Sequence, residues 1–376
     1  MQIALYKKLR LKHFFSSEKY DIESYLPEGK KYYCSSARNG LREILKVFKG
    51  QSVLLPAYVP QGIFLPFDKE NYNIHFYDLN PDLTINWEPL KKRIIKENIQ
   101  VFVGIYYFGN LQDMQPIKEF CKKQNVLFIE DCAHIFPCEK TKELNIGSLG
   151  DISFFSFNKF LPIPDGAVLC INNKKIDTPI KYHFSFSNAW AICLLTINML
   201  LNTMIDDMHK PLRLKKWLIG FNKKVHEKYY HYVNVSEKPV KMSFISRYLL
   251  NRFDHTKHIY QYRANVAPIL EKLRKQHIVV LVNDTPNMIY MALPLLVEKK
   301  DTLMSKLNRK GIRCTLLQTR WDYGVRGHSG LFPNAENFFN NHLLFPLSLF
   351  TTKLEAAYLF ENIESLDSGE NKIYQR

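Results

Sequence analysis

Short apolar runs alternate with helical patterns over the first half of the chain, from Tyr32 to Asn172. The amphipathic segments are Leu41–Phe48, Ile63–Phe67, Trp87–Lys96 and Met114–Lys123. The apolar runs are Ser52–Leu55, Ile74–Asp78, Val101–Phe108, Val126–Asp131, Ile152–Phe157 and Ala167–Ile171. Strands that alternate with helices are typical of an α/β domain with a mostly parallel sheet. We therefore predict such a domain here, with ligands bound at the carboxyl ends of its strands.

A second, smaller pattern occupies the end of the chain. The segments that read as helices are Ser243–Leu273, Lys300–Arg309 and Lys353–Ile363, and the apolar runs are Ile278–Val282, Met288–Leu296 and Leu343–Leu349. This mixture predicts a small α+β domain. We therefore expect an irregular lead-in over residues 1–30, a large α/β domain over 31–240 and a small domain over 241–376. The polar residues after Asp367 are expected to fray.

The segment between these patterns, residues 175–240, is harder to interpret. Ala189–Ile205 is nearly all apolar, but a membrane-spanning helix needs about 20 apolar residues. A basic stretch follows, with Lys210, Arg213, Lys215, Lys216, Lys223, Lys224 and Lys228. Two interpretations stay open: a buried helix followed by a solvated basic face, which we favour, and a helix that lies on an anionic membrane.

Composition and charge narrow the class of protein. The chain has 376 residues, of which 46% are hydrophobic and 23% charged, an ordinary globular balance. Its net charge of +16 favours anionic partners, such as phosphorylated ligands, nucleic acid or an acidic membrane surface. We expect no nucleic-acid partner, because the sequence has no RNA- or DNA-binding signature and no long Lys/Arg block.

The cysteines and the N-terminal residues bear on the compartment. The seven cysteines are odd in number and none forms a C-x-x-C pair, which favours reduced thiols over disulfides or a zinc site. The first fifteen residues break their apolar positions with charges and have no signal-peptide core. We therefore expect a cytoplasmic protein without a bound metal.

An acid and a lysine fall at or just past the ends of two strand runs. Asp131 ends the run Val126–Asp131, and Lys159 follows the run Ile152–Phe157. A lysine can form a Schiff base with an aldehyde cofactor, and a carboxylate can keep the cofactor's pyridine nitrogen protonated. The positions of these two residues therefore favour lysine Schiff-base chemistry at one edge of the sheet. Without a cofactor, they would be a strand-end cap and a surface lysine.

Five motifs in order resemble the DegT/DnrJ/EryC1/StrS family, the sugar aminotransferases of the fold-type-I pyridoxal-phosphate class. They are Ser35–Leu41, Leu54–Tyr58, Tyr106–Gly109, Glu130–His134 and Gly147–Gly166. The likeness is clear from Tyr32 to Cys170 and returns weakly from Ser243 to Asn265 and in the small domain. Residues 175–240 have no usable match. The resemblance implies a fold-type-I transferase, with a large, mostly parallel sheet and a small C-terminal α+β domain.

The resemblance also implies roles for individual residues. Lys159 would hold the pyridoxal 5'-phosphate as a Schiff base and then move protons as a free amine. The implied cofactor-binding residues are Asp131, His134, Ser36, Ala37, Arg38, Ser156 and Tyr58. Asp131 would contact the pyridine nitrogen, and His134 the ring hydroxyl. Tyr58 would be the aromatic residue nearest the ring.

The phosphate of the cofactor would bind Ser36, Ala37 and Arg38 at the start of a helix, where the helix dipole favours anions. Ser156 would be a second phosphate ligand. The sequence departs from the family pattern near Lys159, because Ser156 stands three residues before the lysine instead of five. Pro164-Asp165-Gly166-Ala167 also stands where the family has Gly-Glu-Gly-Gly.

The function that the resemblance implies is a pyridoxal-phosphate-dependent transamination. The acceptor would be a keto-deoxy sugar, carried on a nucleotide, in surface-polysaccharide or amino-sugar biosynthesis. The donor would be glutamate or another amino acid, and the site would lie in a homodimer. Two other hypotheses stay open: a non-catalytic or regulatory protein that keeps the fold, and a membrane-associated enzyme of polysaccharide assembly.

Overall fold

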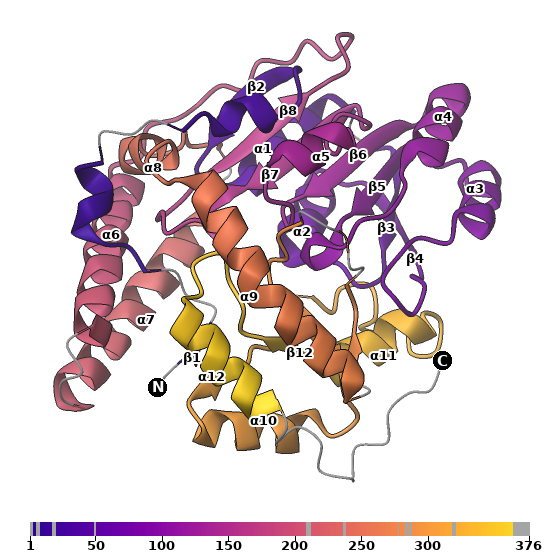
Figure 1. Ribbon diagram of the computed structural model, residues 1–376. Helices are drawn as coiled ribbons and strands as arrows, with labels where there is room; N and C mark the ends of the chain where they lie inside the picture. Colours follow the sequence, from indigo (N-terminus) through magenta and orange to yellow (C-terminus); the bar gives the residue numbers. More distant parts are fainter. Residues whose placement is uncertain are drawn as a thin grey trace.

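A computed structural model describes residues 3–4, 8–16, 20–48, 50–207, 212–235, 238–276, 278–282, 285, 288–317 and 321–363 (Figure 1). The expected fraying after Asp367 and the basic residue Lys210 lie outside the described residues.

A seven-stranded sheet forms the centre of the larger part of the molecule. Its order is β2-β8-β7-β6-β5-β3-β4. The strands are β2 (Lys30–Cys34), β8 (Ala167–Ile171), β7 (Ile152–Ser156), β6 (Leu127–Cys132), β5 (Val101–Ile105), β3 (Ser52–Pro56) and β4 (Asn73–Tyr77). All neighbours from β7 to β4 pair in parallel, whereas β8 is antiparallel to both β7 and β2. The predicted mostly parallel sheet is therefore confirmed.

The strand directions bring three chain segments to one edge. Because β2 and β7 are both antiparallel to β8, they run in the same direction as each other and as β6. The carboxyl ends of β2, β6 and β7 consequently lie on the same side of the sheet. The residues that follow these three ends are the ones from which a site can be built.

Helices connect the strands. They are α1 (Ala37–Leu45), α2 (Gln61–Lys69), α3 (Trp87–Lys96), α4 (Gln115–Gln124) and α5 (Glu139–Glu143). The sequence predicted α3 with these bounds, because its apolar positions recur with helical spacing and Leu90 and Ile94 are buried. It did not predict β2, whose residues Lys-Lys-Tyr-Tyr-Cys form no apolar run although Tyr32 and Cys34 are buried.

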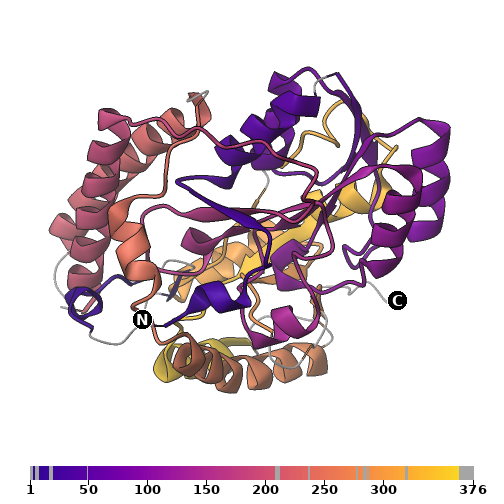
Figure 2. The ribbon, with the colours of Figure 1, turned by 90° about the horizontal axis from the view of Figure 1, so that it is seen from above.

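The C-terminal part contains the antiparallel sheet β12-β10-β9, formed by His342–Phe345, Leu293–Leu296 and Val279–Val280. Helices α9 (His255–Lys275) and α12 (Lys353–Ile363) pack side by side, as Figures 1 and 2 show. The other helices here are α8 (Phe244–Leu250), α10 (Lys300–Arg309) and α11 (Pro333–Asn341). One hydrophobic core runs through both sheets. The predicted domain boundaries at residues 30 and 240 stay a prediction.

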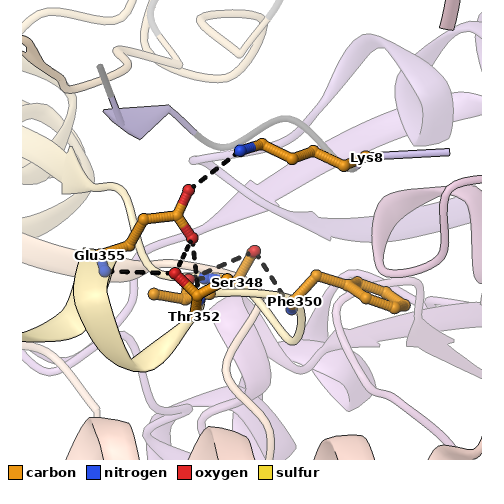
Figure 3. Close-up of polar contacts among 6 residues, drawn as sticks. Lys8, Ser348, Phe350, Thr352 and Glu355 are labelled. Atoms are coloured by element: carbon orange, nitrogen blue, oxygen red, sulfur yellow. Dashed lines mark hydrogen bonds and ion pairs between the residues drawn. The ribbon is translucent and has the colours of Figure 1, made fainter. Parts of the chain in front are cut away.

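The N-terminal segment is more ordered than the predicted irregular lead-in. Strand β1 (Ile3–Ala4) pairs in parallel with β11 (Ile312–Arg313). Figure 3 shows that Lys8 Nζ reaches Glu355 Oε1 of α12 at 3.3 Å. Glu355 Oε2 also accepts hydrogen bonds from the backbone N–H and the hydroxyl of Thr352, at the start of the same helix. One glutamate therefore caps α12 and fixes the N-terminal segment against it.

Two long helices, α6 (Phe186–Asp207) and α7 (Leu212–Val235), fill the segment that resisted interpretation. They pack against each other on one side of the molecule, opposite α3 and α4 (Figures 1 and 2). In the described part of the chain, no helix has the length and apolar character that crossing a bilayer requires.

Asp165 fixes the connection between β7 and β8. Its carboxylate is fully buried and accepts hydrogen bonds from Ser243 N at 3.1 Å, from Ser243 Oγ at 2.5 Å and from Ser246 Oγ. Burial raises the pKa of this carboxyl, while the two serine hydroxyls lower it. The next residue, Gly166, has a φ of +132°, and a Cβ there would lie 2.1 Å from Met242 Cε. The acid that departs from the family pattern thus anchors a turn that only glycine can complete.

Replacing Asp165 by alanine removes the acceptor of three donors, the N–H and hydroxyl of the partly buried Ser243 and the hydroxyl of the buried Ser246. We expect the free energy of unfolding to fall by about 3 kcal/mol, since an unsatisfied buried donor costs roughly 1–3 kcal/mol. Urea titration followed by circular dichroism measures this change. The control is Asp177→Ala, because Asp177 is exposed and pairs with Lys30 at 3.5 Å. Equal urea midpoints for the two variants would show that Asp165 does not anchor the turn.

Candidate active site

A single cavity collects the segments that follow β2, β6 and β7. Its volume is about 760 Å³. The sequence-predicted residues that line it are Ser36, Ala37, Arg38, Asp131, His134, Ser156 and Lys159. Asp131 comes from β6 and Lys159 from the short 3₁₀ turn Phe157–Lys159 after β7, whereas Ser36 is the N-cap of α1 and Ala37 and Arg38 begin that helix. The structure thus brings seven of the eight predicted residues together.

Asp131 presents a buried carboxylate to the cavity. Only 4% of the residue is exposed. One oxygen accepts a hydrogen bond from Ala133 N–H at 2.9 Å. Burial raises the pKa of Asp131 to about 6, while the nearby Lys159 ammonium and the Ala133 N–H oppose that rise. The carboxyl is therefore ionised at pH 7 and above, and it can hold a cationic ring nitrogen in place.

Lys159 has an amine that loses its proton easily. Burial lowers the pKa of Lys159 to about 8. The Asp131 carboxylate raises this pKa and the Arg38 guanidinium lowers it further. Near pH 8, half of the side chains are neutral amines, which can attack a carbonyl carbon or carry a proton.

His134 is held as a neutral ring. Burial and the Lys159 cation lower its pKa well below 6.5. Its Nδ1 accepts a hydrogen bond from Phe108 N–H at 3.1 Å, which leaves the proton on Nε2. Phe108 has a φ of +57°, a rare conformation for a large side chain, and so offers its N–H from a strained turn. His134 can therefore act as a hydrogen-bond donor within the cavity.

Tyr58 is the predicted residue that the structure does not bring to the cavity. Its ring is fully buried and packs against Trp321 at a centroid distance of 4.8 Å and Phe338 at 4.8 Å. Trp321 lines the cavity in its place, and its ring lies 5.7 Å from that of His134. No sequence pattern indicated Trp321, because it comes from the C-terminal part and belongs to no motif.

Two helices begin at the cavity wall. Ser36 precedes α1, and among the described hydrogen bonds its side chain makes none that caps this helix. Residues Pro60–Ile63, at the start of α2, also line the cavity. The side chain of Arg38 reaches from α1 toward α2. Its Nη2 would lie 3.4 Å from a Cβ added to Gly62, in the first turn of α2. Two helix N-termini and a guanidinium form a suitable site for a phosphate dianion.

Ser156 lines the cavity but donates its hydroxyl to Asn158 Oδ1 at 2.9 Å. Asn158 also lines the cavity, and sequence reasoning missed it. The short spacing between Ser156 and Lys159 thus places a serine–asparagine pair beside the lysine. Ser35 also lines the cavity and was not predicted as a site residue. Its Oγ lies 3.5 Å from the hydroxyl oxygen of Tyr229.

Helices α6 and α7 form one wall of the cavity. Leu195 of α6 and His226 and Tyr229 of α7 line it. The opposite wall comes from the C-terminal part, through Met291, Thr315, Leu317 and Leu344. The segment that has no usable match to the family motifs is therefore next to the residues that match them best.

Comparison with known proteins identifies the relatives of this fold and site. The model of the DegT/DnrJ/EryC1/StrS aminotransferase family matches residues 34–364. A UDP-4-amino-4,6-dideoxy-N-acetyl-beta-L-altrosamine transaminase of Campylobacter jejuni is 26% identical over 201 residues, which are 47% of this chain and 51% of the relative. A GDP-perosamine synthase of Escherichia coli O157:H7 is 29% identical over 116 residues, 30% of this chain and 28% of the relative. These matches span about half or less of the curated relatives.

Solved structures match over nearly the whole chain. Helicobacter pylori PseC, an aminotransferase involved in the biosynthesis of pseudoaminic acid, has a TM-score of 0.64 at 13% identity and covers 97% of this chain and 99% of its own. Escherichia coli GDP-4-keto-6-deoxy-D-mannose-3-dehydratase with bound hydrated PLP has a TM-score of 0.64 at 16% identity. The match covers 96% of this chain and 100% of the dehydratase chain. At these identities the likeness establishes the fold.

The charges around Lys159 predict opposite effects of two substitutions on its pKa. Asp131→Asn removes the charge that raises the pKa of Lys159, so the pKa should fall below about 8. Arg38→Gln removes a charge that lowers it, so the pKa should rise. The pH dependence of reductive methylation of Lys159 in the cofactor-free protein, followed by peptide mass mapping, measures both shifts.

Asp113→Asn is the control for these two variants, because Asp113 is an exposed acid before α4. It should leave the midpoint unchanged. If Asp131→Asn raised the midpoint of Lys159 or left it in place, the proposed coupling between the two groups would be wrong.

Proposed function

The chain belongs to the DegT/DnrJ/EryC1/StrS aminotransferase family, and on this basis we propose that it is a pyridoxal-phosphate-dependent aminotransferase acting on a keto-deoxy sugar. The observation that carries the proposal is the shared cavity of Asp131 and Lys159, with a carboxyl pKa of about 6 and an amine pKa of about 8. A carboxylate and a neutral amine can therefore coexist near pH 8.

The residues of the cavity fit the cofactor. When bound, pyridoxal phosphate supplies an aldehyde and an electron sink. The amine of Lys159 would be the nucleophile for that aldehyde, and the Asp131 carboxylate would keep the ring nitrogen protonated. The start of α1, with Ser36, Ala37 and Arg38, is proposed to bind the phosphate, and His134 Nε2–H to donate to the ring hydroxyl.

Proton transfer is the second role proposed for Lys159. Without the cofactor, burial lowers the pKa of the Lys159 amine to about 8, and the Asp131 carboxylate opposes this shift. A free amine with a pKa in this range could take a proton from the substrate carbon and return it elsewhere at moderate pH.

The acceptor is proposed to be a nucleotide-linked keto-deoxy sugar of amino-sugar or surface-polysaccharide biosynthesis. Support comes from the names of the relatives, which are UDP-, GDP- and dTDP-sugar enzymes. The net charge of +16 suits a diphosphate ligand. We propose that the α6–α7 wall recognises the sugar, and that glutamate is the amino donor, as the family resemblance implies.

The assembly and the compartment are also proposals. We propose a homodimer, as the resemblance implies, and light scattering tests it. A cytoplasmic location is supported by the cysteines, which are all described and form no disulfide. Asp131 and Lys159 favour a catalytic protein over a non-catalytic or regulatory one, although Pro164-Asp165-Gly166-Ala167 departs from the family pattern.

Lys159→Ala should abolish cofactor attachment and turnover, because no other lysine lines the described cavity. Incubation with pyridoxal phosphate and borohydride, followed by peptide mapping, should label the Lys159 peptide in the native protein alone. The control is Lys174→Ala, an exposed lysine after β8, which should label normally. An adduct on the same peptide in the Lys159→Ala protein would refute the assignment.

His226→Ala should raise the KM for the keto-sugar about tenfold, the effect of losing one hydrogen bond of about 1.4 kcal/mol. Borohydride trapping at Lys159 should be unchanged, because His226 lines the cavity from α7 and is not among the predicted cofactor residues. Initial rates with UDP-, GDP- and dTDP-linked 4-keto-6-deoxy sugars measure the effect. His183→Ala is the control, since His183 is exposed and precedes α6. An unchanged KM with every accepted sugar would remove α7 from the acceptor site.

A further inference from the structure

An uncharged apolar stripe runs along the outer face of α6. It consists of Phe186, Trp190, Ile197, Leu201 and Met204, which are between 37% and 77% exposed. Their spacing of four, seven, four and three residues places them on one side of a helix. No charged residue occurs from Phe186 to Met204. The favoured sequence interpretation, a buried helix, therefore holds only for the inner side of α6.

Helix α7 adds aromatic and basic residues beside this stripe. Leu214 is 55% and Trp217 62% exposed, and the Trp217 ring stacks on that of Phe221 at 5.7 Å. Lys224 and Lys228 continue the same spacing of three and four residues and are exposed. One face of α7 thus begins apolar and ends cationic.

The two helices are joined through their inner sides. Ala191, Ile192 and Tyr229 form a small buried cluster between them, separate from the main core. The stripe on α6 and the Leu214–Lys228 face of α7 stay outside that cluster. In Figures 1 and 2 the pair forms one flank of the molecule. A contiguous exposed apolar face of this kind marks an interaction surface, unlike scattered single residues.

We propose that the outer face of α6 and α7 docks on an anionic membrane surface. The α6 stripe and Trp217 would enter the boundary between headgroups and acyl chains, where tryptophan is favoured. Lys224 and Lys228, with the exposed Lys216 and Lys223, would contact anionic headgroups. The helices would lie along the surface, with their inner sides still packed on the protein.

The charges favour a membrane over a second copy of the chain. A twofold interface places the same patch on both partners, so two faces of equal positive charge would be brought together. Glu227 is the acidic residue of α7, and it already lies 3.8 Å from Lys223. An anionic lipid surface supplies the negative charge that the patch lacks.

Docking would also place the cavity close to the membrane. Leu195 of α6 and Tyr229 of α7 line the cavity from the inner sides of the same helices. The proposed sugar chemistry would then take place beside the membrane surface. Membrane docking does not depend on the proposed aminotransferase activity, so a result against one does not contradict the other.

Flotation of the purified full-length protein with vesicles tests the charge component. We expect co-flotation with phosphatidylglycerol-containing vesicles, much weaker recovery with pure phosphatidylcholine, and loss of binding in high salt. Lys224→Gln/Lys228→Gln should weaken binding about thirtyfold, since each lysine near an anionic surface contributes roughly fivefold. Lys122→Gln/Lys123→Gln, on exposed positions of α4 at the opposite flank, is the matched control.

Trp190→Ser/Ile197→Ser tests the apolar component and should abolish flotation. Tyr260→Ser/Leu354→Ser is its control, because both residues are more than 70% exposed on α9 and α12. Circular dichroism and borohydride trapping at Lys159 establish that each variant is folded. Absence of flotation by the native protein, or equal flotation of all variants, would overturn the proposal. So would conversion of a dimer to a monomer by the α6 substitutions, which would identify the stripe as a contact between copies.

Discussion

The attraction between the Asp131 carboxylate and the Lys159 ammonium is the interaction on which the site depends. Burial drives both groups toward their neutral forms, raising the pKa of Asp131 to about 6 and lowering that of Lys159 to about 8. Each charge opposes this effect on the other, so both are ionised between these two values in the cofactor-free protein. The pair thus keeps a carboxylate available over the whole range in which the amine becomes a nucleophile. Either group alone would be displaced further toward its neutral form.

The scaffold holds this pair through the alternation of side chains along β6. Glu130 and Asp131 are adjacent, so they point to opposite faces of the sheet. Glu130 is fully buried and accepts hydrogen bonds from Gly147 N–H at 3.2 Å and Gly150 N–H at 2.6 Å, in the loop that leads into β7. One acid therefore fixes the segment that carries the lysine, while its neighbour faces the lysine in the cavity. Asp165 anchors the segment after the lysine in the same manner, through Ser243 and Ser246.

The sequence predicted the parts of the site that depend on strand direction. Asp131 and Lys159 lie at or just past the ends of predicted strands, and parallel pairing brings such residues to one edge whatever the details of packing. Ser36–Arg38 were predicted from the family resemblance instead. Trp321 could not be predicted, because its place depends on how the C-terminal part packs against Tyr58 and His134. Strand β2 escaped prediction for a related reason: its lysines and tyrosines alternate in burial without forming an apolar run.

Hydrophobicity alone also could not distinguish the two sides of α6. Its inner side packs Ala191 and Ile192 against α7, whereas its outer side leaves five large apolar side chains in water. Burying one such side chain contributes roughly 1.5–3 kcal/mol, so the exposed stripe forgoes a stabilisation that its residues could supply elsewhere. The lysines of α7 do not compensate for this, because they are solvated themselves. The proposed membrane surface suits a face that combines both features, because a lipid bilayer with anionic headgroups is charged outside and apolar inside.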